Sequence, residues 1–318
     1  MRVDAAIAAM RGDRMPQRRA QAAMVVAVDA WRAEARVAPI LADLVRYGSG
    51  AELAACPSLA RLFDSGTEGA RFAGRFCAVY SASLMDQPFG QLPFRHGFDG
   101  ALSTLLLARA GNAQLALTAL EPGDYHAASV TFSDAVRHDA VVAGEAWARA
   151  TRRSPDGLLV HREIRVEPEC RLTLDLSHEA LFVSRVERRL VTLRLHRAAA
   201  EPDTMREYRL ADGALLQQAA GAIRHSRQEM MLALLGRMKR HEAAPLMAEI
   251  AVQQGPDSLR WEALREALAL DTAQGFAALC QLARSPLDPL AVPAGGLRAQ
   301  LIEAHPRLRA FEEARCLG

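Results

Sequence analysis

Histidine side chains in the middle of the chain are the first residues that could carry chemistry. His126, His138 and His178 are candidate ligands, because two or three neutral imidazoles that converge with a carboxylate such as Glu145 suit iron or zinc. Their spacing alone does not select a metal motif. His138 opens a predicted strand, where an ordinary hydrogen-bonded surface position is the alternative. The sequence therefore indicates a possible metal site. Convergence of the three histidine side chains in the folded protein would establish it.

Arginine side chains on adjacent predicted strands form a second candidate, a site for an anion. A guanidinium can hold a carboxylate through two parallel hydrogen bonds. Arg194 is the preferred residue, because its neighbours Leu193 and Leu195 belong to the opposite, apolar face of the strand. Thr192 and Trp147 complete the predicted ligand-binding residues. The alternative is an exposed sheet face on which arginines pair with interleaved glutamates. The arginines concerned are Arg185, Arg188, Arg189, Arg194, Arg197, Arg206 and Arg209.

The direction of the Arg194 side chain has two possible consequences. If it points into the interior of the sheet structure, it must meet Asp175, Glu145, another carboxylate or a bound anion, because an unpaired buried charge costs several kcal/mol. A carboxylate ligand is then the natural expectation. If it points to solvent, it serves solubility, and the anion site loses its preferred residue.

Nucleophilic catalysis and nucleotide binding find little support in the sequence. Ser177, His178 and Glu179 are consecutive, so their side chains diverge in a strand, and no G-x-S-x-G, G-x-G-x-x-G or P-loop pattern occurs. The five cysteines form no C-x-x-C pair, so neither a disulfide framework nor a zinc site is expected.

The charge balance and hydropathy restrict the class of partner. The chain has 39 basic and 37 acidic residues, so no global field favours nucleic acid or an anionic membrane. No apolar run reaches the roughly 18 residues of a membrane span, and charged residues interrupt the first twenty positions. We expect a cytoplasmic, soluble protein that binds neither nucleic acid nor membrane.

The elements that must position these residues change in character along the chain. Residues 1–100 have helical spacing of apolar residues, with Pro39 as a break, and end in a connector. Residues 101–220 contain short alternating segments, and Gly111-Asn112 predicts a hairpin turn. Residues 221–318 return to helical spacing. This order predicts an α+β protein whose antiparallel jelly-roll barrel is flanked by an N-terminal helical segment and a C-terminal region of helical hairpins.

The C-terminal region also contains an internal repeat. The segment from Met230 aligns with the segment from Glu262 at an offset of 32 residues, which pairs Leu232 with Leu264. Such a period is typical of helical hairpins and resembles a short HEAT-like array, with an ordinary helical bundle as the alternative. A protein partner is expected on these helices.

The stretch from His178 to Tyr208 resembles the second half of a cupin barrel, nearest to thiol-dioxygenase-like cupins. In that family an iron-ligating histidine lies a little over a dozen residues before a strand that begins Ser-Leu-His, and here His178 precedes Thr192-Leu193-Arg194. The resemblance implies a jelly-roll barrel and, for an enzyme, iron. The family's first pair of histidines is missing near residues 130–132.

These patterns lead to two hypotheses of different classes. The first is a ligand- or peptide-binding accessory or adaptor protein built on a cupin-like barrel that has lost its metal box, with a small anionic ligand and no fixed cofactor. The alternative is a mononuclear non-haem iron dioxygenase in which His178 acts with His126 or His138. A purely structural accessory of a neighbouring enzyme is a third possibility that sequence does not separate from the first.

Overall fold

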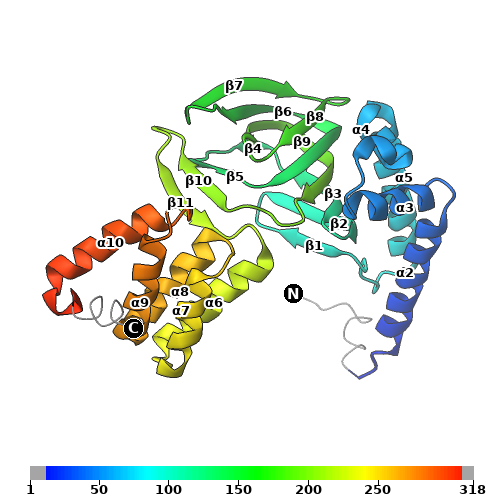
Figure 1. Ribbon diagram of the computed structural model, residues 1–318. Helices are drawn as coiled ribbons and strands as arrows, with labels where there is room; N and C mark the ends of the chain where they lie inside the picture. The colour runs from blue at the N-terminus through cyan, green and yellow to red at the C-terminus, as the bar shows by residue number, and fades with distance from the viewer. Residues whose placement is uncertain (1–11, 310–318) are drawn as a thin grey trace, which may run out of the picture. The chain divides into compact units, whose positions relative to one another are not determined.

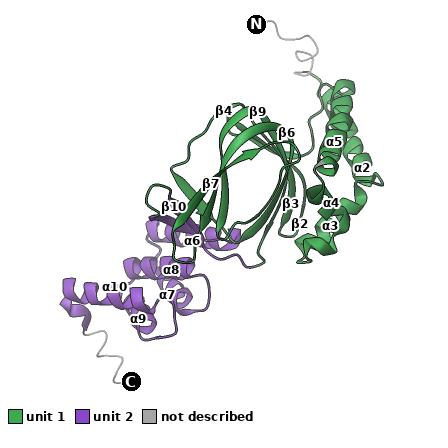
Figure 2. Cartoon of the chain, turned by 90° about the horizontal axis from the view of Figure 1, so that it is seen from above, with its two compact units in different colours: residues 1–200, 210–213 green, residues 201–209, 214–318 purple. Residues whose placement is uncertain are grey.

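The computed structural model describes residues 12–309 and divides the chain into two compact units (Figure 2). Unit 1 comprises residues 1–200 and 210–213, and unit 2 comprises residues 201–209 and 214–318. The predicted N-terminal helical segment and most of the predicted barrel segment therefore fall in one unit. The extreme N-terminus and Cys316 lie outside the described residues.

The helices of unit 1 form where apolar residues recur at spacings of three and four. Met24, Val28 and Trp31 make one buried stripe, and the first helix ends before Pro39, as the sequence predicts. Aromatic rings from the last helix pack around Trp31, with the Phe76 ring centroid 5.2 Å away. The helical elements are α2 Met15–Ala33, α3 Ala38–Gly48, η1 Leu53–Ala55, α4 Pro57–Asp64 and α5 Gly66–Asp86.

Apart from β5 (Ser129–Phe132), the strands of unit 1 form one antiparallel sheet, which confirms the predicted antiparallel arrangement. Its order is β1-β2-β3-β9-β6-β7, with β4 also paired to β9 and β8 also paired to β6. The predicted turn at Gly111 joins β2 to β3, where Ala110 pairs with Ala113. The strands are β1 Arg95–Phe98, β2 Leu102–Ala110, β3 Ala113–Leu120, β4 Gly123–Asp124, β5 Ser129–Phe132, β6 Ala135–Arg153, β7 Leu159–Val166, β8 Arg171–Asp175 and β9 Glu179–Ala198.

Bulges bend the two long strands β6 and β9 into a barrel-like curve (Figure 2). Their pairing shifts register several times between Val141 and Ala148. Gly144 lies in this stretch with φ 95°, and a Cβ there would sit 2.2 Å from the Arg189 carbonyl oxygen. The bend therefore requires glycine at this position.

The curved sheet has different cores on its two faces. Leu115, Leu193 and Leu195 are fully buried against α2 to α5, which cover one side of the sheet in Figure 1. On the other face Val141 and Val186 belong to a second cluster between the strands. Alternation along β9 therefore sends Arg194 to the interior side, away from the helices.

Unit 2 is a hairpin of strands followed by helices, and it confirms the predicted helical character up to residue 309. Leu232 and Leu264 both lie in its core. Within the described residues, none of the helices has the length and apolar character needed to cross a membrane. The elements are β10 Met205–Arg209, β11 Leu215–Ala219, α6 Ile223–Arg237, η2 His241–Ala243, α7 Ala244–Val252, α8 Asp257–Leu270, α9 Thr272–Ala283, α10 Ala291–Ala304 and η3 Pro306–Leu308.

Candidate anion site in the barrel

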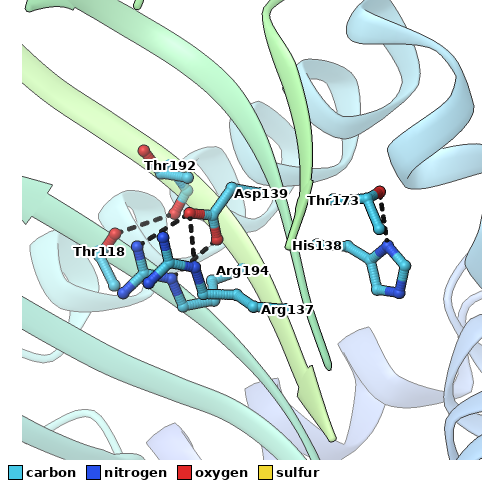
Figure 3. Close-up of polar contacts among 7 residues, drawn as sticks. All are labelled: Thr118, Arg137, His138, Asp139, Thr173, Thr192 and Arg194. Atoms are coloured by element: carbon cyan, nitrogen blue, oxygen red, sulfur yellow. Dashed lines mark hydrogen bonds and ion pairs between the residues drawn. The ribbon is translucent and has the colours of Figure 1, made fainter. Parts of the chain in front are cut away.

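Two guanidiniums share one buried carboxylate on the interior face of the sheet. Arg194 is directly opposite Asp139 in the β6–β9 ladder, and its Nε and Nη2 donate to Asp139 Oδ1 and Oδ2 at 2.8 and 3.0 Å (Figure 3). Arg137 Nε lies 3.2 Å from Asp139 Oδ2 as an ion pair. The Arg194 guanidinium thus donates to both oxygens of the Asp139 carboxylate, and Arg137 contacts only an oxygen that Arg194 already binds.

The surroundings place this cluster at the edge of the barrel interior. Val141 follows Asp139 on the same face of β6 and packs in the inner hydrophobic cluster. Buried threonines of the neighbouring strands lie beside it, and Thr118 Oγ1 donates to the Thr192 carbonyl oxygen at 3.4 Å. The cluster therefore lies against a wall that carries hydroxyl groups and is otherwise apolar.

Burial governs the electrostatics of the cluster. The Asp139 side chain is 3% exposed and Arg194 is 31% exposed. Burial lowers the pKa of Arg137 and nearby Arg194 lowers it further, while Asp139 opposes both effects. Burial also lowers the pKa of His196, to which Arg137 and Arg194 add repulsion. Two guanidiniums and one carboxylate leave an excess of positive charge in a poorly hydrated place.

A cavity of about 220 Å³ adjoins this cluster through Arg137. Arg149 also lines it, and among the described residues no hydrogen bond or ion pair engages the Arg149 guanidinium. Thr151 lines the cavity as well, with Oγ1 3.0 Å from His161 Nδ1. The remaining wall is mainly apolar and includes Phe182. The cavity thus has two lining arginines and no lining carboxylate.

The three predicted ligand-binding residues have different positions. Arg194 lies on the face opposite Leu193 and Leu195, as predicted. Its partner is Asp139, a carboxylate other than Asp175 and Glu145. Thr192 is buried beside the cluster. Trp147 is 40% exposed and pairs across strands with Arg165 and Arg185, so it lies on the outer face.

The three predicted metal ligands lie apart. His126 is exposed after β4. His138 faces the helices, with Nε2 3.4 Å from Tyr47 Oη and Nδ1 3.0 Å from Thr173 Oγ1, and Figure 3 shows it directed away from Asp139. His178 occupies the turn before β9. Within residues 12–309, no group of three or more His, Cys, Asp or Glu side chains is arranged to hold a metal ion.

Arginines on the outer face form ion pairs, which agrees with the alternative interpretation for them. Arg189 pairs with Glu121 at 2.9 Å, Arg188 pairs with Glu145, and Arg185 lies 3.8 Å from Asp124. Most of these side chains are exposed, so they stabilise the protein little and keep the sheet soluble.

Sequence reasoning missed Asp139, Arg137 and Arg149. Asp139 stands before the apolar residues Ala140 and Val141 within a strand, and a carboxylate in such a run signals a buried partner. The sequence contains that signal but does not name the partner.

Comparison with solved structures finds proteins that are similar to about a third of this chain. No protein-family model and no curated protein sequence matches the chain. Vicilin from Capsicum annuum is similar over 36% of this chain and 33% of its own, with 16% identity and a TM-score of 0.29. The capsular polysaccharide assembling protein CapF from Staphylococcus aureus is similar over 38% and 36%, with 17% identity and a TM-score of 0.28.

A cupin superfamily protein from Desulfitobacterium hafniense is similar over 32% of this chain and 83% of its own, with 14% identity and a TM-score of 0.24. The chain spans about a third of the length of the vicilin and of CapF. The strand pairing and the helix bounds of this chain are the evidence for its α+β class, its antiparallel barrel and its flanking helices.

Proposed function

We propose that the barrel binds a small anion carrying a carboxylate or a phosphate, and that the protein works as a ligand-binding accessory protein. The observation that carries the proposal is the sharing of buried Asp139 by Arg137 and Arg194, beside a cavity that Arg137 and Arg149 both line. A buried charge is stable only when it is paired, and a bound anion supplies the missing pair.

The size of the cavity restricts the ligand. A volume of about 220 Å³ corresponds to about seven water molecules at liquid density. A short dicarboxylate or an inorganic phosphate fits within such a space. The apolar residues of the wall, such as Phe182, favour a ligand with a short hydrocarbon part.

The two arginines have separate roles in this proposal. Arg194 is held by both oxygens of Asp139 and keeps the carboxylate in place. Arg137 has spare donors, because a guanidinium carries five N–H groups and its Nε, 3.2 Å from Asp139 Oδ2, is in an ion pair without a hydrogen bond. We therefore assign anion contact to Arg137 and Arg149, and positioning of Arg137 to Arg194 and Asp139.

Calorimetric titration with succinate and with phosphate tests the proposal. Wild-type protein should bind one of the two anions, and Arg149→Met should weaken that binding about tenfold or more while leaving the buried cluster intact. Arg137→Met should have a similar effect. Arg185→Met is the matched control, because this arginine lies on the outer face.

Circular dichroism of each variant separates loss of binding from loss of folding. Absence of binding by folded wild-type protein, or unchanged affinity in both Arg137→Met and Arg149→Met, would contradict the proposal. Unchanged stability and unchanged binding in Arg194→Met would remove the positioning role assigned to Arg194.

A further inference from the structure

A second and larger cavity lies wholly within unit 2. Its volume is about 700 Å³, and it is bounded by α6, α7, the start of α8 and the segment before β10. Helix α6 packs on α8, and α7 packs on α8 and α9. Both helices thus contact α8, and the cavity occupies the space between them.

The internal repeat shows that this space is an opening in an otherwise closed arrangement. Leu246 on α7 lines the cavity and is 60% exposed, whereas its counterpart Ala278 on α9 is 5% exposed. Ile250 on α7 also lines the cavity and is only partly buried, whereas its counterpart Leu282 on α9 is 1% exposed. The helical pair α8 and α9 thus buries positions that remain exposed or only partly buried in the pair α6 and α7.

The cavity has a polar end and an apolar end. Along α6 the lining residues pass from Arg224, His225 and Gln228 to Met231 and Leu235. Since a helix rises about 1.5 Å per residue, this row is about 16 Å long. The cavity is therefore elongated, with polar side chains at the first part of the row and apolar side chains at the second.

The polar end contains hydrogen-bonding groups without partners. His225 Nε2 lies 3.0 Å from Arg224 Nη2, and because a guanidinium only donates, Nε2 is the acceptor. The His225 proton is then on Nδ1, which is buried and has no acceptor. Gln228 Oε1, one helical turn further, is buried without a donor. Both atoms are covered although their residues line the cavity, so rotation of the two side chains toward the cavity would let a ligand head group with one acceptor and one donor satisfy them.

Charges around the cavity are compensated within unit 2. Arg260, which is buried, is paired with Asp288 and lies 3.7 Å from Asp257. Arg224 lies 3.6 Å from Glu201. In contrast with the barrel cavity, this one has no excess charge, so it favours an uncharged head group.

We propose that this cavity binds a neutral amphiphile, a molecule with an unbranched apolar chain and a carboxamide head. The carboxamide carbonyl accepts from His225 Nδ1, its N–H donates to Gln228 Oε1, and the chain lies against Met231, Leu235 and Leu246. This site is independent of the anion site in the barrel.

Calorimetric titration with octanamide tests this inference. The wild-type protein should bind octanamide, and should bind butanamide and octanoate about tenfold or more weakly, because butanamide lacks the long chain and octanoate carries a charge. Leu246→Trp fills the cavity from an exposed position and should reduce octanamide affinity by about tenfold or more. Gln228→Leu should reduce it by a smaller factor.

Val292→Trp is the matched control, because Val292 is also an exposed aliphatic residue on a helix of unit 2 and does not line the cavity. It should bind octanamide as the wild type does. Failure of wild-type protein to bind octanamide, equal affinity for octanoate, or unchanged affinity in a folded Leu246→Trp variant would overturn the inference. None of these outcomes affects the barrel site, which succinate and phosphate report.

Discussion

Asp139 and Arg194 face each other across the β6–β9 ladder, 55 residues apart in sequence, and are joined by two hydrogen bonds. The carboxylate is almost fully buried, and Arg137 lies against one of its oxygens. Removal of the shared carboxylate from such a cluster leaves buried positive charge without a partner, which is strongly destabilising.

Replacement of the shared carboxylate should therefore destabilise the protein strongly. In Asp139→Asn two guanidiniums lose their common partner, and we expect the free energy of unfolding to fall by about 3 kcal/mol. Denaturant titration followed by circular dichroism measures the change. Asp124→Asn, at an exposed ion pair, is the control and should change stability by less than about 0.5 kcal/mol. Equal effects at the two positions would contradict the account of the cluster.

His138 should make the stability depend on pH. Its pKa is lowered from the ordinary 6.5, first by burial and then by Arg197, while Asp139 and Asp64 oppose the shift. The folded state thus disfavours the protonated ring, so this stabilisation is complete above pH 6.5 and is lost as the pH falls below it. We expect His138→Gln to flatten the fall in unfolding free energy between about pH 7 and pH 5. The same substitution at exposed His126 is the control, and equal slopes in both variants would be inconsistent with this role.

The glycine at the bulge of β6 should be irreplaceable. A Cβ at Gly144 would collide with the Arg189 carbonyl oxygen, and its φ of 95° is unfavourable for other residues. We expect Gly144→Ala to lower the unfolding free energy by about 1 to 3 kcal/mol. Gly97→Ala, where a Cβ meets nothing within 4 Å, is the comparison in the same thermal melts. A Gly144→Ala variant with the same melting temperature as Gly97→Ala would show that the bend does not depend on glycine at position 144.

The separation of the histidines predicts low metal content. Protein purified without chelator should contain far less than one iron or zinc per chain, because His126, His138 and His178 lie in different places. Elemental analysis by mass spectrometry measures this. Near-stoichiometric iron that is lost in both His138→Ala and His178→Ala would restore the iron dioxygenase hypothesis and contradict the binding hypothesis.

Local patterns in the sequence predict the elements well, because helix and strand periodicity depend on neighbouring residues. The break near Pro39, the hairpin at Gly111 and the direction of Arg194 relative to Leu193 all follow from such patterns. The antiparallel barrel and the helices after residue 221 follow as well.

Contacts between residues that are far apart in the sequence do not follow from local patterns. The partner of Arg194 depends on the register between β6 and β9, which no local pattern fixes. The sequence predicts Trp147 as a ligand-binding residue, but the bulges near Gly144 change which face of the strand it lies on and place it outside. His138 is a predicted metal ligand, but the helices pack on its face of the strand. Its ring contacts Tyr47 and Phe63 instead of a metal site.

A crystal structure of the protein soaked in succinate or phosphate, whichever calorimetry shows to bind, would locate the anion directly. We expect density for the anion in the cavity of unit 1, within hydrogen-bond distance of the Arg137 and Arg149 guanidiniums, and no such density in Arg149→Met crystals. An anion bound elsewhere while this cavity stays empty would contradict the proposed anion site.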